Sequence, residues 1–139
     1  MAEAPINPDG AARRPLILVV DDSVDIRNFF QVTLKPHYDT RLAVDGPTGL
    51  AAAAKSPAPE LILLDVEMPG LNGYEVCSAL KANPLTARIP VIFSSARSNP
   101  KDQAHGLSLG AVDYITKPLS PPIVLARIGT LDTVRVTER

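Results

Sequence analysis

The chain has 139 residues, 45% of them hydrophobic, with a net charge of −1 and a pI near 6.1. This length and apolar content suit one domain with a single core, and the charge gives no basic surface for nucleic acid. No apolar run is long enough to cross a membrane, and residues 1–14 lack the apolar middle of a signal peptide. We therefore expect a cytoplasmic domain that binds neither nucleic acid nor a membrane.

Residues 1–14 combine Ala, Pro, Gly and charge without an apolar period, which predicts a disordered tail before a folded domain at residues 15–139. Within that domain, short apolar runs alternate with stretches of helical length. The runs predict five strands, at Leu16–Val20, Tyr38–Val44, Leu61–Leu64, Ile89–Ser95 and Val112–Thr116. Helices are expected between Ser23 and Pro36, at Pro47–Lys55, Tyr74–Lys81 and Lys101–Leu109, and from Pro121 onward.

This alternation indicates an α/β fold in which helices cover both faces of a doubly wound parallel sheet. The runs LILVV and LILL are apolar throughout, as expected of parallel strands buried on both faces. The run Tyr38–Val44 is more polar and is predicted to be an edge strand. Because parallel strands end at one edge of the sheet, the residues after each strand should form the ligand site.

Metal-binding and nucleophilic sites based on cysteine or histidine are not supported by the sequence. The single cysteine, Cys77, cannot form an internal disulfide and suits a reducing compartment. His37 and His105 are far apart, and neither has a second ligand at zinc spacing. No serine or cysteine is visibly paired with a histidine as a nucleophile.

The residues that follow the strands instead suit a hard metal ion and a phosphoryl group. They are Asp21 and Asp22, then Asp65, then Ser94 and Ser95, and finally Lys117. Three carboxylates placed close together repel one another unless a cation neutralises them, and oxygen ligands favour Mg²⁺, Mn²⁺ or Ca²⁺, with Mg²⁺ the best match beside phosphate. Lysine and a hydroxyl would stabilise the phosphoryl charge. Asp65, alone after the most buried strand, is the candidate nucleophile.

Four segments in this order carry a family resemblance: ILVVDDS, LILLDVEMPGLNGYEV, PVIFSSA and GAVDYITKP. Together they resemble the receiver domain of two-component response regulators, from Leu16 to the last helix. The resemblance implies a flavodoxin-like fold with five parallel strands in the order 2-1-3-4-5. It also implies a phosphoacceptor signalling domain that catalyses only its own phosphorylation and dephosphorylation.

The resemblance assigns roles to the residues at the sheet edge. Asp65 would accept a phosphoryl group from a histidine kinase or phosphotransfer protein, and Lys117 would pair with the phosphoryl oxygens. Asp22 and Asp65 would bind Mg²⁺ directly and Asp21 through water, with the backbone carbonyl of Glu67 completing the protein ligands. The peptide bond between Lys117 and Pro118 would be cis.

The resemblance further implies a switch. Ser95 would hydrogen-bond the phosphoryl group, Tyr114 would turn inward, and the face made by the fourth helix, fifth strand and fifth helix would change shape. This face would bind an output domain or a second copy of the chain. The C-terminal stretch resembles receivers joined to cyclic-di-GMP enzymes or other output modules, and its helix would continue as a linker or pair with a copy of itself.

Glu67 and Arg97 occupy positions that, in the family, tune the lifetime of the phosphoryl group. Their opposite charges suggest a pair across the mouth of the site that obstructs the hydrolytic water. The alternative is two solvated side chains whose pairing contributes little.

Two other functions remain open on the sequence. A Mg²⁺-dependent phosphatase with an aspartyl nucleophile is disfavoured because Asp65 is not followed by the second aspartate of a DxD pattern. A pseudo-receiver that only binds partners is disfavoured because every acceptor position is filled. Each site residue taken alone also fits a structural role, as a helix cap, a turn, a loop or, for Tyr114, core packing.

Overall fold

The structure is a computed structural model that describes residues 14–97 and 99–137. The predicted disordered tail lies outside the described residues except for Arg14. This arginine forms an ion pair with Asp39 (3.1 Å) and donates hydrogen bonds to the carbonyl oxygens of Lys35 and Tyr38. Arg14 therefore contacts the end of the first helix and the start of the second strand.

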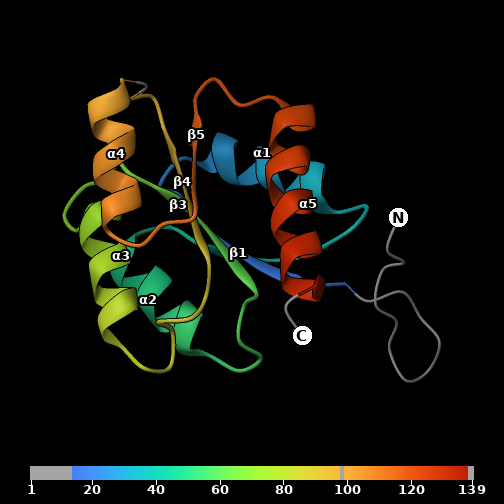
Figure 1. Ribbon diagram of the computed structural model, residues 1–139, viewed down its shortest axis with the longest axis horizontal. Helices are drawn as coiled ribbons and strands as arrows, with labels where there is room; N and C mark the ends of the chain where they lie inside the picture. The colour runs from blue at the N-terminus through green and yellow to red at the C-terminus, as the bar shows by residue number, and fades with distance from the viewer. Residues whose placement is uncertain (1–13, 98, 138–139) are drawn as a thin grey trace.

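The described residues form five strands that alternate with five helices (Figure 1). The strands are β1 Leu16–Val20, β2 Asp39–Ala43, β3 Leu61–Asp65, β4 Val91–Ser95 and β5 Asp113–Thr116. The helices are α1 Val24–Leu34, α2 Gly46–Ala54, α3 Gly73–Ala82, α4 Pro100–Ser108 and α5 Pro121–Thr137. All strand pairs are parallel, in the order β2-β1-β3-β4-β5. The predicted fold class and strand order are confirmed.

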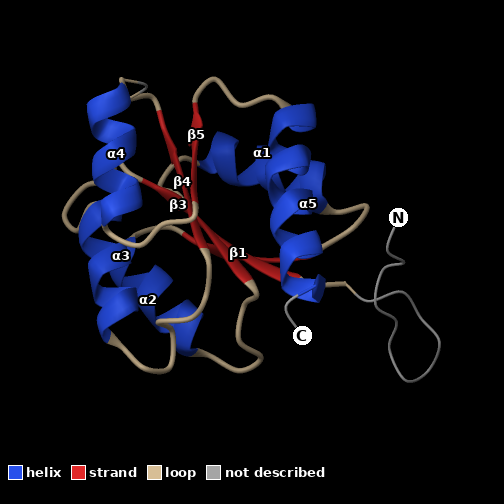
Figure 2. Ribbon diagram, viewed as in Figure 1, coloured by secondary structure: helices blue, strands red, loops and turns tan. Residues whose placement is uncertain are grey.

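Helices cover both faces of the sheet (Figure 2). On one face, α2, α3 and α4 lie over a core that includes Leu64, Val76 and Phe93. On the other face, α1 and α5 contribute Phe30 and Ile128 to a second core. Since β1, β3 and β4 carry side chains into both cores, their sequences are apolar up to the polar residues at the carboxyl ends of β3 and β4.

Strand boundaries differ from the predicted ones by one or two residues. The edge strand β2 is shorter than the predicted Tyr38–Val44, and β4 begins at Val91 because Pro90 has no N–H for the ladder. In the other direction, β3 continues through Asp65, which pairs in register with Ser94. Asp65 is therefore held by the sheet itself rather than by the loop that follows it.

Polar side chains begin four of the helices. Ser23, Asp45, Asn72 and Asn99 each accept a hydrogen bond from a backbone N–H in the first turn. Asn72 also forms a capping box with Glu75. Because each helix follows a strand, these caps fix how the loops leave the carboxyl edge of the sheet. Among the described residues, no helix has the length and apolar character needed to span a membrane.

Leu63→Ala should destabilise the protein because it leaves a cavity at the centre of the sheet, where Leu63 is only 1% exposed. We expect the free energy of unfolding to fall by about 2–5 kcal/mol, measured by urea denaturation. The control is Leu85→Ala, since Leu85 is 74% exposed and its truncation should cost less than about 0.5 kcal/mol. Equal losses in the two variants would contradict this description of the core.

Candidate functional site

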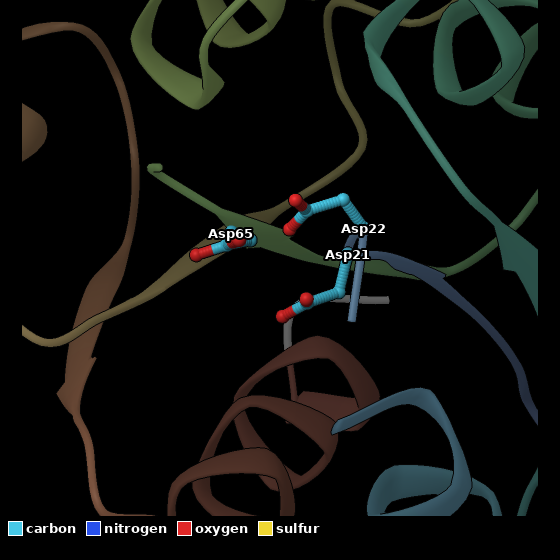
Figure 3. A group of neighbouring side chains, drawn as sticks. All are labelled: Asp21, Asp22 and Asp65. Atoms are coloured by element: carbon cyan, nitrogen blue, oxygen red, sulfur yellow. The ribbon is translucent and has the colours of Figure 1, made fainter. Parts of the chain in front are cut away.

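Three aspartates meet at the carboxyl edge of β1 and β3 (Figure 3). Asp21 and Asp22 follow β1, and Asp65 is the last residue of β3. One carboxylate oxygen from each lies within 4.8 Å of the other two. Asp21 and Asp65 are buried, whereas Asp22 is exposed. The arrangement has the donor set of a site for a hard divalent cation, with one side open to solvent.

Hydrogen bonds to the backbone fix Asp21. Its Oδ1 accepts from the N–H of Ser23 (2.9 Å), and its carbonyl oxygen accepts from Nη1 of Arg27 (2.8 Å). The N–H of Asp21 donates to the carbonyl oxygen of Ala43 on β2 (3.1 Å). Arg27 was not predicted from the sequence. Its position in α1, four residues after the capping Ser23, was the available signal, because a first-turn side chain can reach back to the preceding loop.

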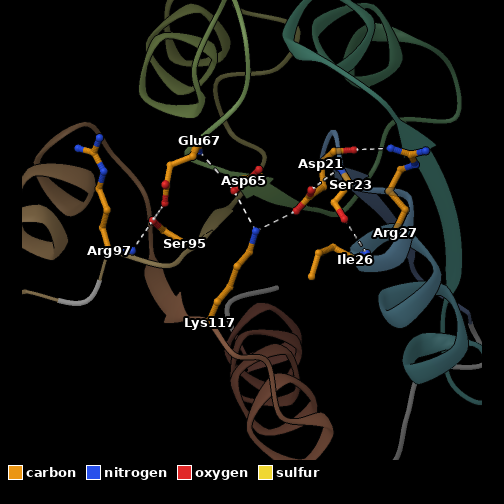
Figure 4. Close-up of polar contacts among 9 residues, drawn as sticks. All are labelled: Asp21, Ser23, Ile26, Arg27, Asp65, Glu67, Ser95, Arg97 and Lys117. Carbon is orange, nitrogen blue, oxygen red and sulfur yellow. Dashed lines mark hydrogen bonds and ion pairs between the residues drawn. The ribbon is translucent and has the colours of Figure 1, made fainter.

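Lys117 joins two of the carboxylates from the end of β5 (Figure 4). Its Nζ lies 3.2 Å from Oδ1 of Asp65 and 3.4 Å from Oδ2 of Asp21, residues that are 52 and 96 positions away in the chain. The N–H of Lys117 donates to the carbonyl oxygen of Ser95 (2.8 Å), and the Lys117–Pro118 peptide bond is cis. The structure thus brings together the predicted lysine and aspartates.

Burial and the charges of neighbouring groups shift the pKa values of Asp21, Asp65 and Lys117. Burial, and then the charge of Asp21, raise the pKa of Asp65 to about 6, although Lys117 and the N–H of Glu67 oppose the rise. Burial also raises the pKa of Asp21. For Lys117, burial alone would lower the pKa, but the two carboxylates outweigh it and the net direction is upward. Both carboxylates therefore take up a proton more readily than usual. A cation that binds their ionised forms would favour ionisation and lower both pKa values.

Ser95 and Glu67 form a contact that the sequence analysis did not predict. The Ser95 hydroxyl is fully buried, donates to Oε1 of Glu67 (2.9 Å) and accepts from the N–H of Arg97 (2.9 Å). The predicted ion pair between Glu67 and Arg97 is not formed. Figure 4 shows the Glu67 carboxylate turned toward Ser95 and the Arg97 guanidinium pointing away. A nearby buried hydroxyl gives the carboxylate a partner, while the exposed guanidinium keeps its hydration.

Gly73, the first residue of α3, lies directly against the backbone of Asp65. A Cβ at this position would be 2.2 Å from the Asp65 carbonyl oxygen, and the N–H of Gly73 donates to the carbonyl oxygen of Val66 (2.9 Å). Only glycine permits this approach. The sequence alone did not indicate that Gly73 supports Asp65.

The remaining predicted switch residue, Tyr114, is on β5 opposite Phe93 in the β4 register. Its side chain is turned inward and is 5% exposed. In the described part of the chain, no hydrogen bond joins Tyr114 to Asp65; the Tyr114 hydroxyl lies 3.3 Å from that of Tyr74.

A doubly wound parallel sheet with an acidic cluster, a lysine and a buried serine at its carboxyl edge defines a phosphoacceptor type of signalling domain. The sequence pattern of the response regulator receiver domain matches residues 17–129. The chain belongs to this family, which comprises the receiver domains of two-component response regulators.

Similar proteins agree with this assignment. A protein of Vibrio cholerae named as a probable cyclic di-GMP phosphodiesterase is 45% identical over 114 residues, which are 82% of this chain and 26% of that protein. Response regulator PleD of Caulobacter vibrioides is 42% identical over 83% of this chain and 25% of its own. The DNA-binding response regulator MtrA of Mycobacterium leprae is 36% identical over 83% of this chain and 50% of its own. The chain therefore spans about a quarter to a half of the length of these relatives.

Solved structures also resemble the fold closely. The chemotaxis response regulator CheY4 of Vibrio cholerae superposes with a TM-score of 0.79 at 28% identity, covering 85% of this chain and 98% of that chain. The receiver domain of the Francisella response regulator 1452 gives a TM-score of 0.80 at 29% identity, covering 88% and 99%.

The raised pKa of Asp65 predicts a pH dependence of stability in metal-free protein. Since the folded-state pKa is above the ordinary aspartate value of 3.8, protonated Asp65 stabilises the fold fully below that pH, and this stabilisation is lost as the pH rises through about 6. Asp65→Asn removes this loss. Its free energy of unfolding relative to the unsubstituted protein should therefore increase by about 2–3 kcal/mol between pH 4 and pH 7.5, measured by urea denaturation with a chelator.

The control for this prediction is Asp39→Asn, because Asp39 is exposed and lies at the opposite edge of the sheet. Its effect on stability should be smaller over the same pH range, because its ion pair with Arg14 is exposed to solvent. A difference between Asp65→Asn and the unsubstituted protein that does not change with pH would contradict the electrostatic description of the site.

Proposed function

We propose that Asp65 is the phosphoacceptor of this receiver domain. The observation that carries the proposal is the contact of Lys117 Nζ with Asp65 (3.2 Å) and Asp21 (3.4 Å) at the edge where β1, β3 and β5 end. An ammonium group in this position can stabilise the negative charge on the phosphoryl oxygens while the group moves from the donor to the aspartate. Asp65 is also the member of the cluster held within a strand and supported from behind by Gly73.

In the proposed reaction, an oxygen of the Asp65 carboxylate attacks phosphorus and forms a P–O bond. The bond between phosphorus and the donor breaks, and its electron pair leaves with the donor, as the imidazole of a phosphohistidine or as the acetate ion of acetyl phosphate. The product is an acyl phosphate, and attack by water later returns the carboxylate and inorganic phosphate. The domain thus acts as a catalyst only for its own phosphorylation and dephosphorylation.

The cation proposed for the site is Mg²⁺. Asp21, Asp22 and Asp65 offer carboxylate oxygens within 4.8 Å of one another, and the backbone carbonyl of Glu67 is the fourth proposed protein ligand. The all-oxygen donors and the exposed Asp22 fit an ion that keeps several waters and accepts a phosphate oxygen. When bound, Mg²⁺ would neutralise the carboxylates and stabilise charge on the phosphoryl oxygens.

Ser95 and Tyr114 are the proposed switch residues, and the output surface is the α4-β5-α5 face. That face contains a hollow of about 240 Å³ lined by residues from all three elements, among them Gln103, Tyr114 and Ile123. We propose a histidine kinase or phosphotransfer protein as phosphodonor in the cytoplasm, with no role for nucleic acid or a membrane at this domain. An output domain or a second copy of the chain is the proposed partner of the α4-β5-α5 face, with α5 continuing as the linker in the first case.

Phosphorylation of Asp65 can be tested by intact-mass measurement after incubation with Mg²⁺ and acetyl phosphate. We expect the gain of one phosphoryl group per chain. The gain should vanish in Asp65→Asn, which keeps the shape of the side chain but lacks the nucleophile, and should persist in the control Asp39→Asn. Lys117→Ala should reduce the rate by about 100-fold or more, because it removes a charge that stabilises the transition state.

A mass gain that survives in Asp65→Asn would contradict the assignment of Asp65. Continuous release of phosphate from a small phosphate ester would support the phosphatase instead, and no gain from any donor would support the pseudo-receiver.

Glu67 is also proposed to tune phosphorylation, through Ser95 rather than through Arg97. Its carboxylate occupies the hydrogen bond that the Ser95 hydroxyl would give to a phosphoryl oxygen, and it places negative charge beside the incoming group. Arg97 holds Ser95 through its backbone N–H, so its side chain is not needed for this contact.

Glu67→Ala should therefore accelerate phosphorylation by acetyl phosphate by about tenfold, as expected from the loss of one hydrogen bond to a charged group. Glu67→Gln keeps a hydrogen-bond acceptor without the charge and should give an intermediate rate. Arg97→Ala is the matched control and should leave the rate within about twofold of the unsubstituted protein. Equal effects of Glu67→Ala and Arg97→Ala would instead favour the ion pair across the mouth of the site.

A further inference from the structure

A second hydroxyl contact lies between α3 and β5. The Tyr74 hydroxyl is 3.3 Å from the Tyr114 hydroxyl and 3.5 Å from the carbonyl oxygen of Asp102 on α4. A carbonyl oxygen can only accept, and Tyr74 has one proton to give. When both contacts are made, Tyr74 donates to Asp102 and Tyr114 donates to Tyr74. The contacts then link β5, α3 and α4 in series.

Aromatic packing holds these hydroxyls in place. The Tyr74 ring lies edge-on to Phe93, with centroids 5.2 Å apart, and to His105, at 4.7 Å. The Tyr114 ring is 6.0 Å from Phe93. Gly106 lets α4 approach, since a Cβ there would be 2.9 Å from Phe93 and 3.1 Å from Tyr114. Tyr74 is the contribution of α3 to this packed group, and burial is the main cause that raises the pKa of its hydroxyl.

Tyr74 is also connected to the acceptor region. It follows Gly73, whose backbone lies against the Asp65 carbonyl. A backbone displacement at the end of β3 would therefore move Gly73 and, with it, the adjacent Tyr74. Its side chain lines a cleft of about 320 Å³ together with Glu67 and Arg97, which flank Ser95. One side chain therefore lines the cleft beside Glu67 and also contacts the hydroxyl of Tyr114.

We propose that Tyr74 is a positioning residue that holds Tyr114 inward through its hydroxyl and transmits changes at Asp65 to the α4-β5-α5 face. This proposal rests on the function proposed above. It adds a path through α3 to the path through Ser95. The contact biases Tyr114 toward the inward orientation, and loss of the Tyr74 hydroxyl should shift that equilibrium outward by about fivefold, the effect of one neutral hydrogen bond.

Ring-labelled tyrosine provides a direct test, because the chain has three tyrosines and no tryptophan. In ¹³C-tyrosine NMR of the metal-free protein, Tyr74→Phe should move the Tyr114 signal toward the position of an exposed tyrosine. Tyr38→Phe is the control, since Tyr38 precedes β2 at the opposite edge of the sheet, and it should leave the Tyr114 signal in place. Thermal unfolding should stay close to that of the unsubstituted protein, since phenylalanine keeps the ring packing.

The same variants give a functional readout. Phosphorylation of Tyr74→Phe by acetyl phosphate with Mg²⁺ should slow by up to about fivefold, because phosphorylation and the inward orientation of Tyr114 favour each other in the proposed switch. Tyr38→Phe should react at the original rate. If Tyr74→Phe does not fold, Tyr114→Phe carries the test from the other side, and the Tyr74 signal should move.

An unchanged Tyr114 signal in folded Tyr74→Phe would overturn this proposal, whether or not the protein takes a phosphoryl group. Conversely, a moved signal in a protein that cannot be phosphorylated would retain the contact between the two tyrosines but overturn the function on which its signalling role depends.

Discussion

Electrostatic repulsion among Asp21, Asp22 and Asp65 is the constraint on which the site depends. With all three ionised and Lys117 protonated, the cluster carries a formal charge of −2, which one divalent cation would match. Burial, and then the charge of Asp21, raise the pKa of Asp65 to about 6 although the charge of Lys117 lowers it. The repulsion makes the site receptive to a cation and then to a phosphoryl group, whose charge needs both the cation and the lysine.

The fold supports this unfavourable cluster by rigid means. Asp65 is held in register with Ser94 by the β3–β4 ladder, and Gly73 brings α3 against its carbonyl group. Asp21 is held by the N–H of Ser23 and by Arg27. Because Asp21 and Asp65 are buried at the ends of apolar strands, their carboxylates cannot move apart without disrupting the core. The burial that stabilises the domain thus also keeps the acidic groups together.

Two hydroxyl contacts involve the proposed switch residues Ser95 and Tyr114. Ser95 is bound to Glu67, and Tyr114 to Tyr74. The bond between the two tyrosines is neutral, and the bond between Ser95 and Glu67 has one charged partner. Both are of modest strength, so a new phosphoryl charge can compete with them. A phosphoryl group can shift the domain only by its different interaction with two conformations. Contacts of this strength keep the energy difference between such conformations small.

The sequence by itself determined the fold class, the edge position of β2 and the meeting of Asp21, Asp22, Asp65 and Lys117. Apolar runs locate the strands, and parallel strands must end at one edge, so local pattern was sufficient. Tertiary structure alone decided that Glu67 turns to Ser95 instead of Arg97, that Gly73 touches Asp65 and that Tyr74 meets Tyr114. These contacts depend on rotamers and on distances of a few tenths of an ångström between residues far apart in the chain, which no local pattern encodes.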